Sequence, residues 1–184
     1  MKLYVIGGKA KTGKNTFGDY LREELKDYGY KPCVMHITSP LYGYARNYFE
    51  WDGNENSKPR EFLQKMGIEI IQQKLGKRDF LLNRLEEDIE ILKEFFDVFI
   101  ITDARLLHEF EVLKSKYPDV ITIKLERNHY KDLLSEEERH HITETELDQY
   151  LDFDYIVENT SLDSLKDKAK EIVYKEEKDR GEII

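Results

Sequence analysis

A glycine-rich segment near the start of the chain carries residues that can bind phosphate. It runs from Gly7 to Thr16 and reads Gly-Gly-Lys-Ala-Lys-Thr-Gly-Lys-Asn-Thr. Gly8 and Gly13 bracket four residues, which allows a tight turn whose backbone N–H groups point inward at a phosphate chain. Lys14 follows at once and adds a full positive charge for the β- and γ-phosphates of a nucleotide. The segment is therefore predicted to be a phosphate loop.

The residues around this loop have the pattern that a phosphate loop requires. The apolar run Leu3-Tyr4-Val5-Ile6 precedes it, and a segment with helical spacing begins at Phe17. The N-terminus of a helix adds favourable partial charge to an anion site. The alternative is a simple glycine-rich turn, which this context disfavours. The predicted nucleotide contacts are Gly8, Lys9, Ala10, Lys11, Thr12, Gly13, Lys14, Asn15 and Thr16, with Lys14 also catalytic.

Position 15 departs from the usual sequence of such loops. A Ser or Thr, whose hydroxyl binds Mg²⁺, normally follows the lysine, and this chain has Asn15 there. The amide oxygen of Asn15 is also a hard ligand, so we expect it to take that place. Thr16 can reach the α-phosphate or cap the helix.

Two charged residues follow a buried-looking apolar run. The continuous stretch Val98-Phe99-Ile100-Ile101 is typical of a central parallel strand that is covered on both faces. Ligands bind beyond the carboxyl ends of such strands. Asp103 is therefore a candidate catalytic residue that holds Mg²⁺ or accepts a proton, and Arg105 a candidate that grips a phosphate bidentately. The alternative is an Asp that caps the next helix, with a surface pair between Arg105 and Glu109.

A further candidate site lies between these two regions. Arg60 follows Pro59 at a predicted helix start, where it is a candidate phosphate clamp, and Gln64 can contact a base. A solvated helix face is the alternative. Upstream, Tyr42 is a candidate for stacking on a base, within an aromatic cluster that is otherwise expected to be core. The cluster consists of Tyr42, Tyr44, Tyr48, Phe49 and Trp51.

The chain becomes highly charged between Arg127 and Leu151. A segment of this kind after a strand predicts a lid over the phosphates, in which Arg139 stabilises the transferring group and Arg127 binds the nucleotide. An exposed charged helix is the alternative. Asn159, after the last predicted strand, can contact adenine or simply turn.

Composition limits the classes of function. The chain has 184 residues, a net charge of −9, a pI of about 5.2 and one cysteine, Cys33. Binding to nucleic acid polymers or acidic membranes is therefore disfavoured, and a disulfide or zinc cluster within the chain is excluded. Without a visible signal peptide or apolar span, we expect a soluble cytoplasmic protein. We expect one domain over residues 1–184, with an acceptor-binding helical insertion over about 41–95 and a lid over about 127–151.

Strand and helix patterns alternate along the chain, which predicts an α/β fold with a mostly parallel sheet and helices on both faces. The helical patterns include Leu85, Ile89, Leu92 and Phe96, and a second set from Leu162 to Val173. The predicted strands are Lys2 to Ile6, Pro32 to Ile37, Val98 to Thr102, Val120 to Leu125, and Tyr155 to Val157.

Four motifs in this order resemble those of the deoxynucleoside monophosphate kinase family of bacteriophages, within the P-loop nucleoside and nucleotide kinase group. The family's GKxxxGKDT, RxxLQxxG, TDxRxxxE and HxSE are similar to Gly8–Thr16, Arg60–Gly67, Thr102–Glu109 and His141–Glu144. Asn159-Thr160-Ser161-Leu162 also looks familial. Asn15 replaces the family's acid, and Thr143 replaces its serine.

The resemblance implies a three-layer P-loop kinase fold with five parallel strands in the order 2-3-1-4-5 and a lid. It also implies transfer of the γ-phosphoryl group of ATP, with Mg²⁺, to a nucleoside monophosphate. Lys14 and the loop would hold ATP, while Arg60 and Arg105 would hold the acceptor phosphate. The alternatives are a kinase of the same fold that acts on dephospho-coenzyme A or phosphomevalonate, and a nucleotide-binding regulatory protein without turnover, which Asn15 supports. A homodimer is possible through the aromatic insertion.

Overall fold

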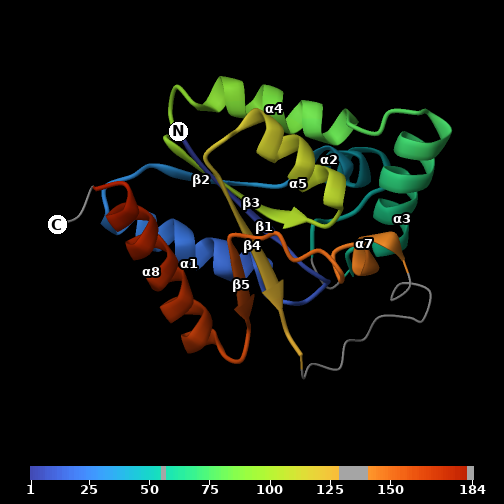
Figure 1. Ribbon diagram of the computed structural model, residues 1–184. Coiled ribbons are helices and arrows are strands. Elements are labelled where there is room, and N and C mark those ends of the chain that lie inside the picture. The colour runs from blue at the N-terminus through green and yellow to red at the C-terminus, as the bar shows by residue number, and fades with distance from the viewer. Residues whose placement is uncertain (55–56, 129–140, 182–184) are drawn as a thin grey trace. The chain divides into compact units, whose positions relative to one another are not determined.

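The computed structural model describes residues 1–54, 57–128 and 141–181 (Figure 1). The chain divides into two compact units, one made of Met1–Val34 with Lys93–Ile184 and the other of Met35–Leu92. Each unit is described by itself. The single domain predicted for residues 1–184, with its insertion and lid, stays a prediction. No helix in the described part of the chain is long and apolar enough to cross a membrane.

The first unit is built on a five-stranded parallel sheet in the order β2-β3-β1-β4-β5. β1 is the central strand and pairs in parallel with both β3 and β4, and β4 pairs in parallel with β5. The predicted strand order is thereby confirmed. The strands span Lys2–Gly7 (β1), Pro32–Met35 (β2), Val98–Ala104 (β3), Val120–Glu126 (β4) and Tyr155–Glu158 (β5).

Helices cover both faces of this sheet, because alternate residues of a strand point to opposite sides. Tyr4 and Ile6 belong to a buried apolar cluster with residues of α1 (Lys14–Asp27) and α8 (Leu162–Asp179). These two helices lie side by side in Figure 1. On the other face, a Cβ added at Gly7 would meet the ring of Phe110 in α5 (Leu107–Lys116). Within this unit, the predicted three layers are confirmed.

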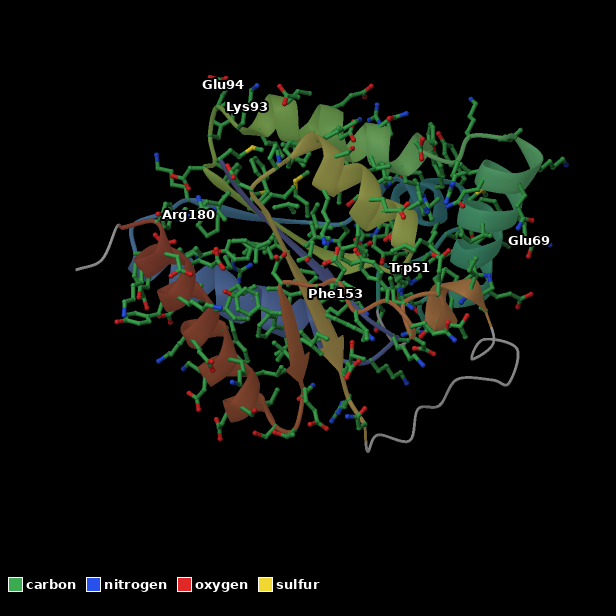
Figure 2. All side chains as sticks on the ribbon, in the orientation of Figure 1. Trp51, Glu69, Lys93, Glu94, Phe153 and Arg180 are labelled. Atoms are coloured by element: carbon green, nitrogen blue, oxygen red, sulfur yellow. The ribbon has the colours of Figure 1, made fainter. Side chains whose placement is uncertain are left out.

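Aromatic packing secures α5 to the segment before β5. Phe110 is fully buried and meets Phe153, labelled in Figure 2, edge to face with 5.1 Å between ring centroids. Phe153 packs in turn on Tyr150 at 5.0 Å. Edge-to-face pairs of this kind stabilise beyond the area that they bury. The chain just after the short helix α7 (Ile142–Thr145) is thus attached to the core.

The second unit is helical. It contains α2 (Ser39–Tyr48), α3 (Arg60–Gln64), which continues into the π-helix η2 (Lys65–Lys74), and α4 (Phe80–Leu92). The prediction that a helix opens near Pro59 is confirmed. The sequence pattern did not predict its change to π geometry, which is rare and frequently lies at functional sites. A Cβ on Gly67 of η2 would lie 3.2 Å from Leu41 of α2, so these helices approach closely.

Candidate functional site

The segment between β1 and α1 forms a compact loop at the carboxyl end of the central strand. Three of its residues have positive φ angles, at 135° for Gly8, 58° for Lys11 and 100° for Gly13. Gly13 is also the N-cap of α1, which has no side-chain cap. Positive φ angles turn successive N–H groups toward one side, and an uncapped helix N-terminus leaves its own N–H groups available. The loop therefore has the backbone geometry that an anion site requires.

Neither Gly8 nor Gly13 can be replaced without strain. A Cβ on Gly8 would lie 2.3 Å from the carbonyl oxygen of Leu125 in β4, and one on Gly13 would lie 2.7 Å from Nδ2 of Asn159. Both distances are too short for real atoms, and the φ angles disfavour side chains in any case. The two glycines let the loop lie directly against β4 and the residue after β5.

Lys14 folds back over the loop. Its Nζ donates hydrogen bonds to the carbonyl oxygens of Gly8, at 2.7 Å, and Lys9, at 2.6 Å. The residue is only 7 % exposed. The ammonium group is thereby held within the turn of the loop. The phosphate-binding and catalytic role of Lys14 stays a prediction.

Asn15 and the end of β3 meet at the start of α1. The hydroxyl of Thr102 donates to Oδ1 of Asn15 at 3.0 Å, and Asp103 is the next residue of the strand. Because consecutive strand residues point to opposite faces, this hydrogen bond does not by itself bring the Asp103 carboxylate to Asn15. The amide oxygen and the carboxylate are both oxygen ligands of the type that Mg²⁺ uses together with phosphates and water. The described residues contain no group of three or more His, Cys, Asp or Glu side chains that could hold a metal ion. The metal role predicted for Asn15 and Asp103 stays a prediction.

Glu109 shapes the turn that carries Arg105. One oxygen of its buried carboxylate accepts hydrogen bonds from the backbone N–H groups of Arg105, at 2.7 Å, and Leu106, at 3.0 Å. Burial raises the pKa of Glu109 to about 7, and the nearby Asp103 adds to the rise. The alternative of a surface pair between Arg105 and Glu109 is wrong, because this carboxylate caps the backbone inside the fold. Asp103 does not cap α5 either, since Leu106 occupies the N-cap position.

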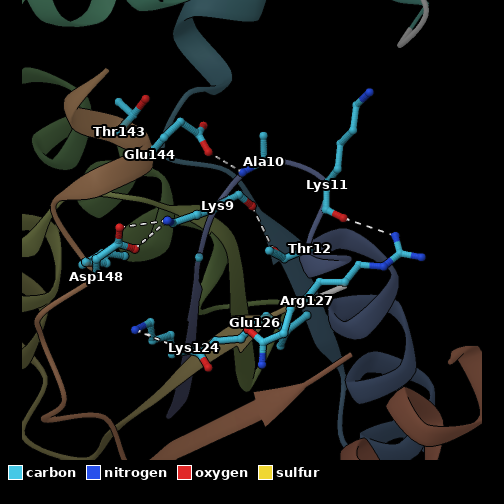
Figure 3. A pocket seen from close by; sticks show the side chains of 14 residues that line it. Lys9, Ala10, Lys11, Thr12, Lys124, Glu126, Arg127, Thr143, Glu144 and Asp148 are labelled. Atoms are coloured by element: carbon cyan, nitrogen blue, oxygen red, sulfur yellow. Dashed lines mark hydrogen bonds and ion pairs between the residues drawn. The ribbon is translucent and has the colours of Figure 1, made fainter. Parts of the chain in front are cut away.

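The short helix α7 brings an unexpected acid to the loop. Oε2 of Glu144 accepts the backbone N–H of Ala10 at 2.7 Å (Figure 3). Oε1 accepts a hydrogen bond from Nη1 of Arg105. Glu144 is buried. The alternative of an exposed charged helix is therefore wrong at this position. In the sequence, Glu144 stands out only as the last residue of the HxSE-like motif. The spacing of the motif did not predict which residues its carboxylate would contact.

Two further acids, both C-terminal to Glu144, attach the same segment. Glu146 accepts the backbone N–H of Leu107 at 2.8 Å, and Asp148 forms an ion pair with Lys9 at 2.8 Å. Leu147, between them, is buried. His141 caps α7 by accepting from the backbone N–H of Thr143 at 3.3 Å. The segment 141–148 thus connects the phosphate loop to the residues after β3.

A cavity of about 260 Å³ opens beside the loop (Figure 3). The side chains that surround it carry both signs of charge, and Lys124 pairs with Glu126 there at 2.9 Å. Nη1 of Arg127 reaches the carbonyl oxygen of Lys11 at 3.5 Å. The lining residues come from three segments, namely Gly8 to Thr12, Lys124 to Asn128, and Thr143, Glu144, Leu147 and Asp148.

Asn159 lies against the loop. Its Nδ2 donates a hydrogen bond to the carbonyl oxygen of Thr12 at 2.8 Å, and its backbone N–H donates one to the carbonyl oxygen of Glu126 at 2.7 Å. This side chain therefore supports the loop backbone, whereas the sequence suggested adenine contact or a turn.

The first unit brings most of the predicted site residues together. The loop from Gly8 to Thr16, Asp103 and Arg105 surround one end of the sheet with Arg127 and Asn159. Arg139, the predicted lid arginine, lies outside the described residues. The remaining predicted acceptor residues belong to the second unit.

In the second unit, Tyr42 is part of a polar aromatic group. Its ring lies 5.8 Å from that of Trp51 and 6.3 Å from that of His36, and Nζ of Lys58 lies 4.9 Å from its centroid. Arg60 begins α3 and Gln64 ends it, so the two lie one turn apart on one helix face. The acceptor roles predicted for Tyr42, Arg60 and Gln64 stay predictions.

Comparison with solved structures identifies the class of fold. APS kinase CysC of Mycobacterium tuberculosis, in complex with AMPPNP and APS, has a TM-score of 0.57 at 10 % identity, over 94 % of this chain and 95 % of that one. Shikimate kinase of Aquifex aeolicus has a TM-score of 0.51 at 18 % identity, over 98 % of both chains. Shikimate kinase of Bacteroides thetaiotaomicron has a TM-score of 0.52 at 16 % identity, over 94 % of this chain and 98 % of that one. The fold is that of P-loop kinases.

The sequence identifies the family more narrowly. The family model for deoxynucleotide monophosphate kinase matches residues 44–169. The chain therefore belongs to the deoxynucleotide monophosphate kinase family, and the resemblance seen in its motifs is confirmed. A search of curated protein sequences gives no significant match.

Proposed function

We propose that this protein transfers the γ-phosphoryl group of ATP to a nucleoside or deoxynucleoside monophosphate, giving the diphosphate and ADP. One observation carries the proposal. Lys14 lies folded over a phosphate loop, and Arg105 is connected to the same loop through the carboxylate of Glu144. A cation for the donor phosphates and an arginine for a second phosphate thus lie at one end of the sheet. The family match supports a nucleotide as the acceptor.

The transfer needs two phosphates held in line. An oxygen of the acceptor phosphate attacks the γ-phosphorus of ATP, and the bond from that phosphorus to the β–γ bridging oxygen breaks, so that ADP leaves. Loop N–H groups and Lys14 hold the donor, and Arg105 holds the acceptor and offsets the charge that repels the two anions. An acceptor phosphate is already a nucleophile at neutral pH, so the reaction requires no strong general base.

Asn15 and Asp103 are the residues that would hold magnesium. Bound Mg²⁺ would neutralise charge on the phosphate oxygens. Thr102 fixes the amide of Asn15 through its hydroxyl, which orients one oxygen ligand before nucleotide arrives. Asp103, which follows Thr102 in β3, would supply a carboxylate. Arg127 and Asn159, which contact the loop backbone, fit the nucleotide-binding side of the site.

A coupled ADP-release assay tests the proposal. Mg²⁺–ATP is supplied with each ribonucleoside and deoxyribonucleoside monophosphate in turn, and ADP is measured with and without acceptor. We expect one or two acceptors to stimulate release well above the acceptor-free rate. A flat panel from protein that still binds ATP would overturn the proposal and favour either a non-nucleotide acceptor or a regulatory nucleotide-binding role.

A further inference from the structure

The carboxylate of Glu144 is shared between the phosphate loop and Arg105. One oxygen accepts the N–H of Ala10 at 2.7 Å, and the other accepts Nη1 of Arg105. The Glu144 side chain is 5 % exposed and that of Arg105 is 24 % exposed. A buried carboxylate with both oxygens engaged has little freedom, so it fixes the place of the guanidinium relative to the loop.

Arg105 needs a counter-ion to remain there. The loop itself carries Lys9, Lys11 and Lys14, and the N-terminus of α1 adds positive partial charge. These charges would repel a neighbouring guanidinium, and water competes for its N–H groups. Glu144 offsets the repulsion. Asp148 does the same for Lys9, but both of those side chains are about half exposed, so their pairing is weak.

The hydrogen bond to Glu144 engages only part of the hydrogen-bonding capacity of Arg105. A guanidinium has five N–H donors in a fixed fork, and the hydrogen bond to Glu144 engages Nη1. The exposed part of the group can still bind a phosphate through two parallel hydrogen bonds. Glu144 can therefore hold Arg105 while Arg105 holds substrate.

We propose that Glu144 is a positioning residue of the phosphoryl transfer, which places Arg105 against the phosphate loop before the acceptor phosphate arrives. The inference rests on the proposed function and adds to it a residue that acts through Arg105. Its physical basis is pre-organisation, because an arginine that is already oriented loses less freedom when it binds and meets the two phosphates at a fixed separation.

Steady-state kinetics of Glu144→Gln test the role. Glutamine keeps an oxygen for the Ala10 N–H but loses the charge that holds Arg105. We expect kcat/KM for the acceptor to fall about 10- to 100-fold, as for other small misplacements of a reacting group, while KM for ATP changes much less. Glu144→Asp, which keeps the charge on a shorter side chain, is expected to recover part of the loss. An unchanged kcat/KM, or tighter acceptor binding because Glu144 competes with phosphate, would overturn the inference.

Glu87→Gln is the matched control. It also removes a carboxylate from an arginine, Arg84 at 3.2 Å, but this pair is exposed on α4. We expect wild-type kinetics from it. A loss equal to that of Glu144→Gln would show a general effect of charge removal and would contradict the assignment.

A double-mutant cycle with Arg105→Ala separates positioning from other roles. If Glu144 acts through Arg105, adding Glu144→Gln to Arg105→Ala causes no further loss in acceptor kcat/KM. Fully additive losses would contradict the inference.

The ion pair can also be followed without turnover. The guanidinium N–H signals of Arg105, assigned with Arg105→Lys, should be protected in ¹⁵N NMR of the wild type and exchange-broadened in Glu144→Gln. Identical signals would overturn the inference. A wild-type protein with protected signals but no acceptor-dependent turnover would instead overturn the proposed function.

Discussion

At the scale of single residues, the site contains charged side chains whose burial alone would cost free energy. Lys14 is almost buried but has two loop carbonyl oxygens as hydrogen-bond partners. Glu144 is buried but is paired with Arg105 and a backbone N–H group. Buried polar groups are tolerated when their bonds are made, and the same bonds fix their geometry. Each of these groups is therefore expected to affect reaction rate more than folding.

Lys14→Ala removes the one full positive charge that the loop holds over its own turn. We expect kcat to fall by at least about 10²–10³-fold, the usual cost of losing one pre-organised donor to developing charge. The unfolding midpoint should change little, because one of the two carbonyl oxygens that it leaves, that of Lys9, still accepts a hydrogen bond from the hydroxyl of Thr12 at 3.0 Å. The coupled assay and thermal unfolding by circular dichroism measure the two quantities. Lys168→Ala, on the surface of α8, is the control. Full activity of the Lys14 variant would contradict the phosphate-loop assignment.

At the scale of helices and strands, close packing against the sheet determines where the loop and its helix lie. Gly18 is in α1, and a Cβ added there would lie 2.4 Å from Cγ2 of Thr102 in β3. The helix thus presses directly on the strand that carries Asp103. Thr102 in turn hydrogen-bonds Asn15. The glycine at position 18 therefore controls the approach of two functional segments.

Gly18→Ala should destabilise the protein even though alanine favours helices. Helix propensity alone would predict a gain of about 1 kcal/mol, whereas overpacking at the interface costs about 1–3 kcal/mol and should dominate. Gly43→Ala in α2 is the matched control, since a Cβ there has nothing within 4 Å. We expect that variant to gain about 0.5–1 kcal/mol. Urea unfolding of both variants measures the difference, and equal stabilisation of both would contradict the packing argument.

Glu109 should make stability depend on pH through the cap before α5. Burial raises its pKa from 4.5 to about 7, so the folded protein binds this proton more tightly than the unfolded chain. The associated stability is complete below pH 4.5 and is lost as the pH rises through about 7, with a full range of about 3 kcal/mol. We expect the free energy of unfolding to fall more steeply between about pH 4.5 and 7 in the wild type than in Glu109→Gln. Urea titrations measure both slopes, and equal slopes would contradict the assignment.

At the scale of the whole molecule, the charge around the phosphate loop is opposite in sign to the net charge of the chain. The chain has a net charge of −9, yet Lys9, Lys11, Lys14 and Arg127 gather at one loop. Asp148 neutralises part of this charge by pairing with Lys9, and Glu144 pairs with Arg105 beside the loop. A protein of this sign attracts polyanions poorly as a whole, but it can bind a small anion at the loop.

Binding of Mg²⁺–ATP should stabilise the whole fold by mass action. At about 100 times its dissociation constant, a ligand adds about 2.7 kcal/mol, which corresponds to a rise of about 5–10 °C in the midpoint for a chain of this size. We expect the rise to shrink when EDTA removes the metal, because Asn15 and Asp103 then face uncompensated phosphate. Differential scanning fluorimetry measures it. Lys14→Ala should lose most of the shift, and an undiminished shift in that variant would place the nucleotide elsewhere.

The sequence by itself predicted a mostly parallel α/β sheet and a phosphate loop, while the order of the strands came from the resemblance to the kinase family. The sheet and the loop follow from local patterns, because continuous apolar runs predict buried parallel strands and two glycines around four residues permit a tight turn. The position of Arg105 after β3 was predicted for the same reason, since strand ends point to one edge of the sheet.

Only the tertiary structure decided the partners of these residues. Glu144 reaches Ala10 and Arg105, which are separated from it by 134 and 39 positions, and Asn159 reaches Thr12 across 147. Glu109 is buried as a backbone cap where its spacing from Arg105 suggested a surface pair. Hydrogen bonds between distant segments depend on which strands are neighbours in the sheet. They also depend on which buried side chains then lie within hydrogen-bonding distance of each other. No periodicity along the chain encodes that arrangement, so the acids that organise the loop emerged only from the folded structure.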